Sequence, residues 1–346
     1  MITAVFKTTN KENEKRIPIY PEHINEIPSH IKEQLLFEKD YATDYGYDDS
    51  TLETWGCKLA PRELLFKRAE VLLLPKPTPI DLLHMDEGQI LCGWNHAVQQ
   101  QEIADIAIRS KLTLISWENM NHITSGNRLH IFYRNNELAG YAGILHFLQL
   151  EGIDGLYGPR KKVIVLGYGS VSRGALYALQ GRGFNNITVY TQRPTHLVAD
   201  KNPVVWYKCF TDKDFARDLA EADIIMNGIL QDVTNPIMFI NDLEEIKPGA
   251  AIIDISCDKE MGFPFAIPTT FEQPIINMGQ GVKYYSVDHT PTYLWNAASR
   301  EISKALLPYL EYIIDKDKWV ESKTVSDAID ILDGEIINQN IIKFQK

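Results

Sequence analysis

The sequence predicts an α/β protein of two domains, one of which is built on a doubly wound parallel sheet. Its 346 residues are 45% apolar and 23% charged, a composition that allows two ordinary globular domains. Short apolar runs alternate with helical patterns along most of the chain. From residue 161 onward this alternation becomes regular, as a parallel sheet covered by helices on both faces requires.

The N-terminal part of the chain predicts an α/β domain of its own. Apolar, β-rich runs indicate strands at about residues 2–6, 71–74, 89–93 and 112–116, and segments with helical periods separate them. The segment "NELAGYAGILHFLQLEGI" that follows has apolar residues at helical spacing and small residues that permit close packing. We expect this segment to form the helix that links the two domains.

The remainder of the chain predicts the doubly wound sheet and then two helices. Six strand-like runs occur in order: "KKVIVLG", "ITVYT", "PVVWYKCF", "ADIIMNG", "AAIIDIS" and "KYYSVDH". After Pro291, residues 292–314 and 325–344 each have the pattern of an amphipathic helix, and we expect both helices to return to the first domain. The predicted domains are therefore residues 1–138 with 290–346, and residues 139–289.

Composition excludes several classes of partner. The net charge of −11 provides no electrostatic footprint for nucleic acid or an anionic membrane. The longest apolar runs are strand-sized, well short of the roughly 20 residues that a membrane helix needs. The first residues lack the pattern of a signal peptide, so we expect a cytoplasmic protein. The four cysteines form no CxxC pair, which favours reduced thiols and predicts no metal site.

A glycine turn follows the first strand of the second domain. In "GYGSVS", Gly167 allows a tight turn, and Gly169 lets the backbone N–H groups of Ser170 and Val171 approach a pyrophosphate at a helix N-terminus. The third glycine of the usual pattern is replaced by Ser172. Because a strand precedes the turn and a helix follows it, the pattern predicts a Rossmann-type dinucleotide-binding domain. The alternative is a turn in an α/β domain that binds nothing.

The second strand of this domain ends without the expected carboxylate. NAD-binding domains place an Asp or Glu about 20 residues after the glycine turn, whereas this chain has Thr191, Gln192 and Arg193. These side chains offer hydrogen bonds and positive charge to the 2′-phosphate of NADP, so we predict NADPH (NADP⁺) as the cofactor. The alternative is that Arg193 is a solvated loop cation and the site accepts either cofactor. Asn227 and Gly228 in "MNGI" are expected to lie close to the ribose.

Four further polar residues are candidates for chemistry: Arg16, Lys76, His96 and Asp258. Taken singly, each has an ordinary explanation. A loop Arg or Lys is usually solvated, a His after a strand usually makes a structural hydrogen bond, and an Asp after a strand commonly forms a turn.

Together with their flanking segments, these residues resemble the alanine dehydrogenase and transhydrogenase family, over nearly the whole chain. "EKRIPIYP" resembles the segment of the substrate-carboxylate arginine and places it at Arg16, and "LLLPKPTP" places the family's lysine at Lys76. "GQILCGWNH" places the acid/base histidine at His96, and "IIDISCD" places the active-site aspartate at Asp258. The resemblance also implies a homo-oligomer.

Within this family, "EGQILCGWNH", "AGYAGILHFL" and "IMNGI" resemble segments of carboxyethylornithine synthases. Enzymes of that type condense pyruvate with the side-chain amine of ornithine or lysine and reduce the imine with NADPH. "VDHTP" departs from the alanine dehydrogenase pattern, which has an Asn there, and resembles the Asp-His pair of saccharopine dehydrogenases. We therefore expect Asp288 and His289 to bind substrate, and this departure weakens the case for ammonia as the amine donor.

The sequence thus predicts an NADPH-dependent reductive condensation of a 2-oxo acid, pyruvate in the first instance, with the amine of an amino acid. Arg16 anchors the carboxylate, Lys76 polarises the carbonyl or shares that carboxylate, His96 is the general acid/base and Asp258 orients the amine. Two alternatives stay open. One is an alanine dehydrogenase that uses ammonia, and the other is a regulatory protein that binds the cofactor without catalysis.

Overall fold

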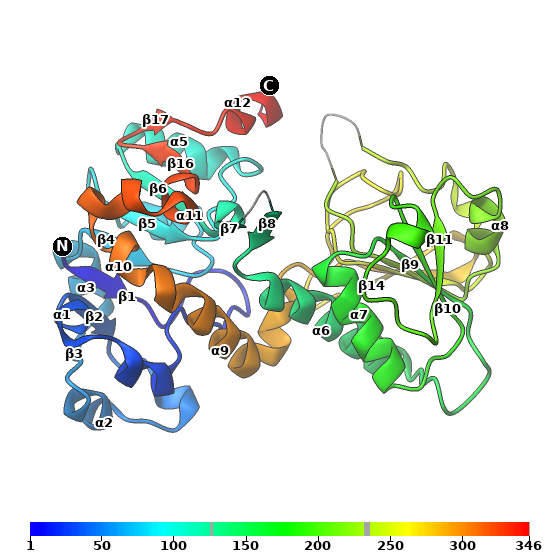
Figure 1. Ribbon diagram of the computed structural model, residues 1–346, viewed down its shortest axis with the longest axis horizontal. Helices are drawn as coiled ribbons and strands as arrows, with labels where there is room; N and C mark the ends of the chain where they lie inside the picture. Colours follow the sequence, from blue (N-terminus) through cyan, green and yellow to red (C-terminus); the bar gives the residue numbers. More distant parts are fainter. Residues whose placement is uncertain (125–126, 232–235, 346) are drawn as a thin grey trace. The chain divides into compact units, whose positions relative to one another are not determined.

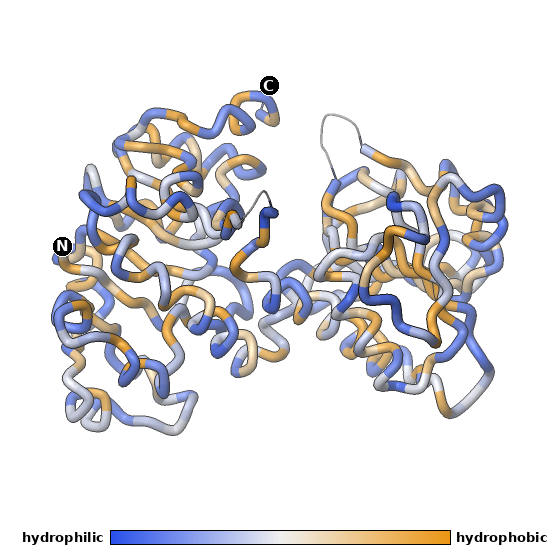
Figure 2. The backbone as a smooth tube through the Cα atoms, viewed as in Figure 1, coloured by the Kyte–Doolittle hydropathy of each residue, from blue (hydrophilic) through white to orange (hydrophobic). Residues whose placement is uncertain are grey.

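The computed structural model describes residues 1–124, 127–231 and 236–345. Its internal contacts divide the chain into two units, Met1–Tyr133 with Trp295–Lys346, and Arg134–Leu294. Both units are α/β, with helices placed against a sheet (Figure 1). In both, the hydrophobic stretches of chain follow the strands and the hydrophilic stretches lie mainly in the connections (Figure 2). Among the described residues, none of the helices combines the length and the apolar character needed to cross a membrane.

The first unit contains an eight-stranded sheet with the order β17-β16-β6-β5-β4-β1-β2-β3. The strands are β1 (Thr3–Val5), β2 (Leu35–Glu38), β3 (Lys58–Ala60), β4 (Val71–Leu73), β5 (Ile90–Gly93), β6 (Thr113–Ser116), β16 (Ile329–Leu332) and β17 (Glu335–Ile336). Strands β1 to β6 pair in parallel, and β16 pairs antiparallel with β6. The four strands predicted here are present, whereas β2 and β3 were not predicted.

Helices cover both faces of this sheet. They are η1 (Pro21–Glu26), α1 (Ser29–Lys32), η2 (Thr43–Tyr45), α2 (Asp49–Thr54), α3 (Arg62–Arg68), α4 (Pro79–Leu82), α5 (Gln101–Arg109), η3 (Trp117–Asn119), α9 (Trp295–Leu306), η8 (Leu307–Tyr309), α10 (Leu310–Ile313), η9 (Lys316–Glu321), α11 (Lys323–Ser326) and α12 (Asn340–Phe344). A hairpin of β7 (Asn121–Thr124) and β8 (Asn127–His130) follows η3. Successive residues of β4 alternate between two cores: Leu73 belongs to the core that includes Ile302 of α9, and Leu72 belongs to the core that includes Ile103 of α5.

The prediction of a helix over residues 325–344 is wrong. The segment contains the end of α11, the hairpin β16-β17 and the short α12. The Asp-Gly pair at Asp333 and Gly334 takes positive φ angles of 48° and 86°, which is the backbone that a tight hairpin turn requires. The preceding helix is also shorter than expected, because α9 passes into the 3₁₀ turn η8 at Pro308, which has no N–H to continue the helix.

The second unit contains a seven-stranded sheet with the order β11-β10-β9-β12-β13-β15-β14. The strands are β9 (Val163–Leu166), β10 (Ile187–Thr191), β11 (Trp206–Cys209), β12 (Ile224–Asn227), β13 (Ala251–Asp254), β14 (Ile275–Met278) and β15 (Val282–Tyr285). All pairs are parallel except that of β14 with β15. Strand order reverses at β9, which creates the crevice where doubly wound sheets bind ligands. The six predicted strands are present, and β14 was not predicted.

Two helices of this unit cross at glycines. The helices are α6 (Tyr133–Glu151), α7 (Ser170–Gly181), η4 (Thr195–Leu197), α8 (Phe215–Ala220), η5 (Leu243–Glu245), η6 (Gly279–Gly281) and η7 (Thr290–Leu294). A Cβ at Gly140 of α6 would lie 1.9 Å from the carbonyl oxygen of Val171, and one at Gly174 of α7 would lie 1.7 Å from that of Glu137. No side chain fits at either position, so both glycines are needed to hold α7 and the turn before it in place.

Helix α8 is fastened to the sheet by a buried carboxylate. Asp218 accepts hydrogen bonds from Lys208 at 2.6 Å, from the Tyr190 hydroxyl at 2.7 Å and from Lys162 at 2.9 Å. Burial alone would raise the pKa of Asp218, but these hydrogen bonds and the charge of Lys162 outweigh it and hold the pKa well below its usual range. The ion-pair cluster therefore contributes to the stability of this unit.

Candidate active site

The carboxyl ends of four adjacent strands gather polar side chains in the first unit. Strands β1, β4, β5 and β6 are parallel neighbours, so their carboxyl ends meet at one edge of the sheet. Arg16 lies in the segment after β1, Lys76 after β4, His96 after β5 and Glu118 after β6. The structure thus brings three of the four candidate catalytic residues to the same edge.

Arg16 is held by contacts on several sides. Its Nε donates to Glu14 Oε1 at 2.8 Å, and its Nη2 pairs with Glu14 Oε2. The guanidinium carbon lies 4.8 Å from the centre of the Trp94 ring, a cation–π contact, and only 3% of Arg16 is exposed. An arginine fixed in this way holds its guanidinium in a defined orientation, which suits recognition of a carboxylate.

The backbone beside Arg16 is fixed by helix α9. The N–H of Ile17 donates to Ser299 Oγ at 3.0 Å, and the Tyr45 hydroxyl donates to the same oxygen at 2.8 Å. Ser299 is fully buried, and its own hydroxyl donates to the carbonyl of Trp295 at 2.7 Å. This serine therefore ties the segment that carries Arg16 to the C-terminal part of the chain.

Lys76 lies next to the segment that carries His96. The N–H of Trp94 donates to the carbonyl of Pro75 at 2.8 Å, so the chain after β4 runs against the chain after β5. A Cβ at Gly93 would lie 1.9 Å from the carbonyl oxygen of Leu74, so only glycine permits this approach. The ammonium of Lys76 is close enough to Glu118 to lower the pKa of that carboxyl group.

Glu118 contacts His96 twice. The His96 backbone N–H donates to Glu118 Oε1 at 2.8 Å, and His96 Nδ1 lies 3.2 Å from the same oxygen. Burial raises the pKa of Glu118 to about 8 against the lowering effect of the His96 N–H, so the carboxyl group is largely protonated at neutral pH. The sequence prediction missed Glu118. An acidic residue two positions after a buried strand, in "TLISWEN", is the signal that was available.

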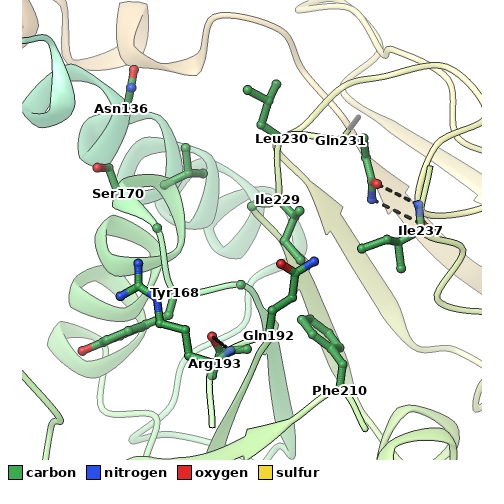
Figure 3. Close-up of a pocket in the computed structure, with 15 residues that line it drawn as sticks. Asn136, Tyr168, Ser170, Gln192, Arg193, Phe210, Ile229, Leu230, Gln231 and Ile237 are labelled. Atoms are coloured by element: carbon green, nitrogen blue, oxygen red, sulfur yellow. Dashed lines mark hydrogen bonds between the residues drawn. The ribbon is translucent and has the colours of Figure 1, made fainter. Parts of the chain in front are cut away.

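The glycine turn of the second unit opens into a groove of about 700 Å³ (Figure 3). Gly167, at φ +87°, and Gly169 line it together with Ser170 and Val171 at the N-terminus of α7. A Cβ added at Gly169 would meet no protein atom within 4 Å, so it would project into the open groove. Because the first turn of a helix presents free N–H groups, this cradle fits the pyrophosphate of a dinucleotide.

The end of β10 forms another wall of this groove. Thr191, Gln192 and Arg193 line it, and the Arg193 N–H donates to Thr191 Oγ1 at 3.2 Å. In Figure 3 the Arg193 side chain extends alongside Tyr168 of the glycine turn. Phe210 and Ile229 supply apolar lining. The wall therefore offers a positive charge and neutral donors where an acidic side chain would repel a phosphate.

Asn227 and Gly228 have different places. Gly228 lines the groove, and a Cβ there would lie 2.6 Å from Ser172 Oγ, so glycine is required by the close approach of α7. Asn227 is fully buried behind the groove, where its Nδ2 donates to Asp254 Oδ1 at 3.0 Å and its Oδ1 accepts from the Ile229 N–H at 3.2 Å. Asn227 thus supports the groove wall rather than lining the groove.

Asp258, Asp288 and His289 form a second group in the same unit. Burial, with a further contribution from the charge of Asp288, raises the pKa of Asp258 to about 6. His289 Nδ1 lies 3.2 Å from Asp288 Oδ2, and the His289 ring packs 4.8 Å from that of Phe271. The group thus combines two neighbouring carboxylates and an imidazole. Within residues 1–124, 127–231 and 236–345, no set of three or more His, Cys, Asp or Glu side chains is arranged to hold a metal ion.

Comparison with known proteins gives relatives across nearly the whole chain. An N(5)-(carboxyethyl)ornithine synthase from Clostridium botulinum is 28% identical over 343 residues, which cover 92% of this chain and 99% of the relative. An alanine dehydrogenase from Halomonas elongata is 23% identical and covers 94% of this chain and 92% of its own length. Among solved structures, an L-alanine dehydrogenase shares the fold, with a TM-score of 0.83, 19% identity and coverage of 100% of this chain and 99% of that one.

Family models agree with these relatives. Residues 5–139 match the N-terminal domain of the alanine dehydrogenase/PNT family, and residues 148–339 match its C-terminal domain. The chain therefore belongs to the alanine dehydrogenase/PNT family.

Proposed function

We propose that the protein is an NADPH-dependent oxidoreductase that joins a 2-oxo acid, pyruvate in the first instance, to the amine of an amino acid such as ornithine or lysine. The amine and the carbonyl condense to an imine with loss of water, and addition of a hydride and a proton gives an N-(carboxyethyl) amino acid. The observation that carries this proposal is the convergence of Arg16, Lys76 and the His96–Glu118 pair at one sheet edge. The name of the relative from Clostridium botulinum supports the product class.

Arg16 and Lys76 would bind the oxo acid. The rigid guanidinium of Arg16, set by Glu14 and Trp94, anchors the carboxylate. The Lys76 ammonium polarises the carbonyl oxygen and so makes its carbon more open to attack by the amine. Both cations are buried, where such interactions are stronger than in water.

His96 would move protons between the reacting oxygen and nitrogen atoms. The contact of its Nδ1 with Glu118 leaves Nε2 as the nitrogen that accepts and returns a proton. Because Glu118 is largely protonated at neutral pH, it orients the ring without holding it permanently as an imidazolium. Loss of water from the carbinolamine and deprotonation of the amine both need such a group.

Asp258, Asp288 and His289 would bind the amino donor. With a pKa of about 6, Asp258 is mostly ionised at neutral pH and attracts an ammonium group, and the carboxylate of Asp288 adds to this attraction. The amine must lose a proton before it attacks, and Asp258 would balance the cation before that loss.

The groove of the second unit would hold the cofactor. Relatives named alanine dehydrogenase and the glycine turn both support a nicotinamide dinucleotide. When bound, it supplies the hydride that reduces the C=N carbon. We infer NADPH rather than NADH because Thr191, Gln192 and Arg193 stand where a carboxylate would select against the 2′-phosphate.

The test is an assay of NADPH absorbance with pyruvate held fixed and the amine varied over ammonia, ornithine, lysine and other amino acids. We expect oxidation that requires both pyruvate and an amino acid. Oxidation with ammonia alone would instead identify an alanine dehydrogenase with altered cofactor choice. No oxidation with any amine, combined with tight NADPH binding, would favour a regulatory protein and contradict the proposal.

A further inference from the structure

Strand β16 carries a β-bulge beside the candidate active site. Ile329 pairs with Ile115 of β6, and Ile331 pairs with Leu114, so Asp330 is the extra residue between two pairs that are consecutive on β6. A bulge leaves its residue out of the ladder and redirects its side chain. Asp330 is consequently a carboxylate with only 3% exposure, placed against the end of β6.

The Asp330 carboxylate accepts hydrogen bonds from a residue before Glu118 and from a residue after it. Asn119 Nδ2 donates to Asp330 Oδ1 at 2.8 Å, and the Ser116 hydroxyl also hydrogen-bonds to this carboxylate. Asn338 Nδ2 donates to the same Oδ1 at 2.8 Å, which fixes Asp330 from the C-terminal side. One carboxylate therefore holds Ser116, which precedes η3, and Asn119, which ends it.

The contacts continue to His96. Asn95 Nδ2 donates to Ser116 Oγ and to the carbonyl of Ile115, both at 3.2 Å. Asn95 is fully buried and immediately precedes His96, whose φ is +50°, a conformation that non-glycine residues adopt only when their surroundings hold them. Asp330 therefore holds the segment of Glu118 by its own hydrogen bonds to Ser116 and Asn119. It supports the segment of His96 indirectly, through Ser116 and Asn95.

We propose that Asp330 is a positioning residue: it holds η3 so that Glu118 orients His96 for proton transfer. This inference rests on the proposed function, in which His96 is the acid/base. Asp330 lies more than two hundred residues from both along the chain, and only the antiparallel pairing of β16 with β6 brings it there.

The negative charge of Asp330 also acts on Glu118. Burial raises the pKa of Glu118 most, and the charge of Asp330 raises it further. The backbone N–H groups of Glu118 and His96 and the charge of Lys76 lower it. Removing the charge of Asp330 while keeping its shape should therefore lower the pKa of Glu118. A carboxylate that stabilised the hairpin without lying close to Glu118 would have no such effect.

Two variants separate position from charge. Asp330→Ala removes the acceptor for Asn119 and Asn338, and we expect kcat to fall on the order of 10- to 100-fold, as small displacements of catalytic groups do, with the KM for NADPH unchanged. Asp330→Asn keeps an acceptor oxygen, and we expect kcat near the wild-type value with the Glu118 limb of the pH–rate profile moved to lower pH by roughly half to one unit. Asp333→Asn is the control, because it removes an exposed charge from the same hairpin.

An NMR titration of the histidine ring signals makes the test independent of turnover. The His96 signal is assigned with His96→Gln, and in Asp330→Asn the titration step that it reports from Glu118 should move to lower pH, whereas Asp333→Asn should match wild type. Wild-type kcat in Asp330→Ala, or superimposable titrations of Asp330→Asn and wild type, would overturn the inference. If the wild-type protein turns over no amine, the titration still decides the role of Asp330, and only the proposed function fails.

Discussion

Arg193 gives the sharpest prediction about the cofactor. Its side chain lines the groove, and among the described residues no ion pair involves its guanidinium, so binding a phosphate does not require an existing ion pair to break. A hydrogen bond to a charged group contributes about 1.5–3 kcal/mol. Because Arg193 is exposed, we take the lower end, about 1.5 kcal/mol, which corresponds to roughly a tenfold change in affinity.

Arg193→Ala should therefore raise the Kd for NADPH about tenfold and leave that for NADH unchanged. Arg193→Asp should weaken NADPH binding further, since a carboxylate repels the 2′-phosphate. Both constants are measured by the quenching of protein fluorescence, and raising the salt concentration should shrink the NADPH effect. Arg217→Ala is the matched control, because Arg217 is an exposed arginine of the same unit that pairs with Asp214. An unchanged ratio of the two dissociation constants in Arg193→Ala would refute this role.

Three further predictions concern turnover and stability. His96→Gln should lower kcat by about 10²- to 10⁴-fold with an unchanged Kd for NADPH, and equal losses in both would contradict its role in proton transfer. Ser299→Ala should raise the KM for the oxo acid, because the segment of Arg16 is loosened, and should lower the free energy of unfolding by about 1–3 kcal/mol in urea; an unchanged KM would count against this positioning. Asp218→Asn should be less stable than wild type at neutral pH. Because the pKa of Asp218 is lowered on folding, that difference should shrink as the pH falls below about 4, the ordinary value for aspartate, and a difference independent of pH would contradict the ion-pair account.

The second sheet was predictable because each of its parallel strands is a continuous apolar run followed by a turn. Strands β2, β3 and β14 were missed because Leu35–Glu38 lies within a pattern of helical period and Lys58–Ala60 and Ile275–Met278 are short and partly exposed. The apolar spacing around the hairpin β16-β17 also fits a helix, although its Asp-Gly pair is a turn signal.

The candidates Lys76, His96 and Asp258 each lie three or four residues after the end of a strand, a position that the sequence pattern indicates. Glu118 also follows a strand, but its contact with His96 depends on the pairing of β5 with β6, and the place of Asp330 depends on the pairing of β16 with β6. No local pattern indicates that β16 joins the sheet beside β6, and only this pairing places Asp330 against η3. Asn227 is buried and donates to Asp254, and local sequence does not distinguish this place from one in the groove.

The most direct test is mass spectrometry of the product formed from pyruvate, ornithine, ammonia and NADPH deuterated at the transferable position. We expect a single product with the mass of pyruvate and ornithine joined with loss of water and gain of one hydrogen and one deuterium, the deuterium lying on the former carbonyl carbon. Deuterated alanine, or unchanged pyruvate and ornithine, would contradict it.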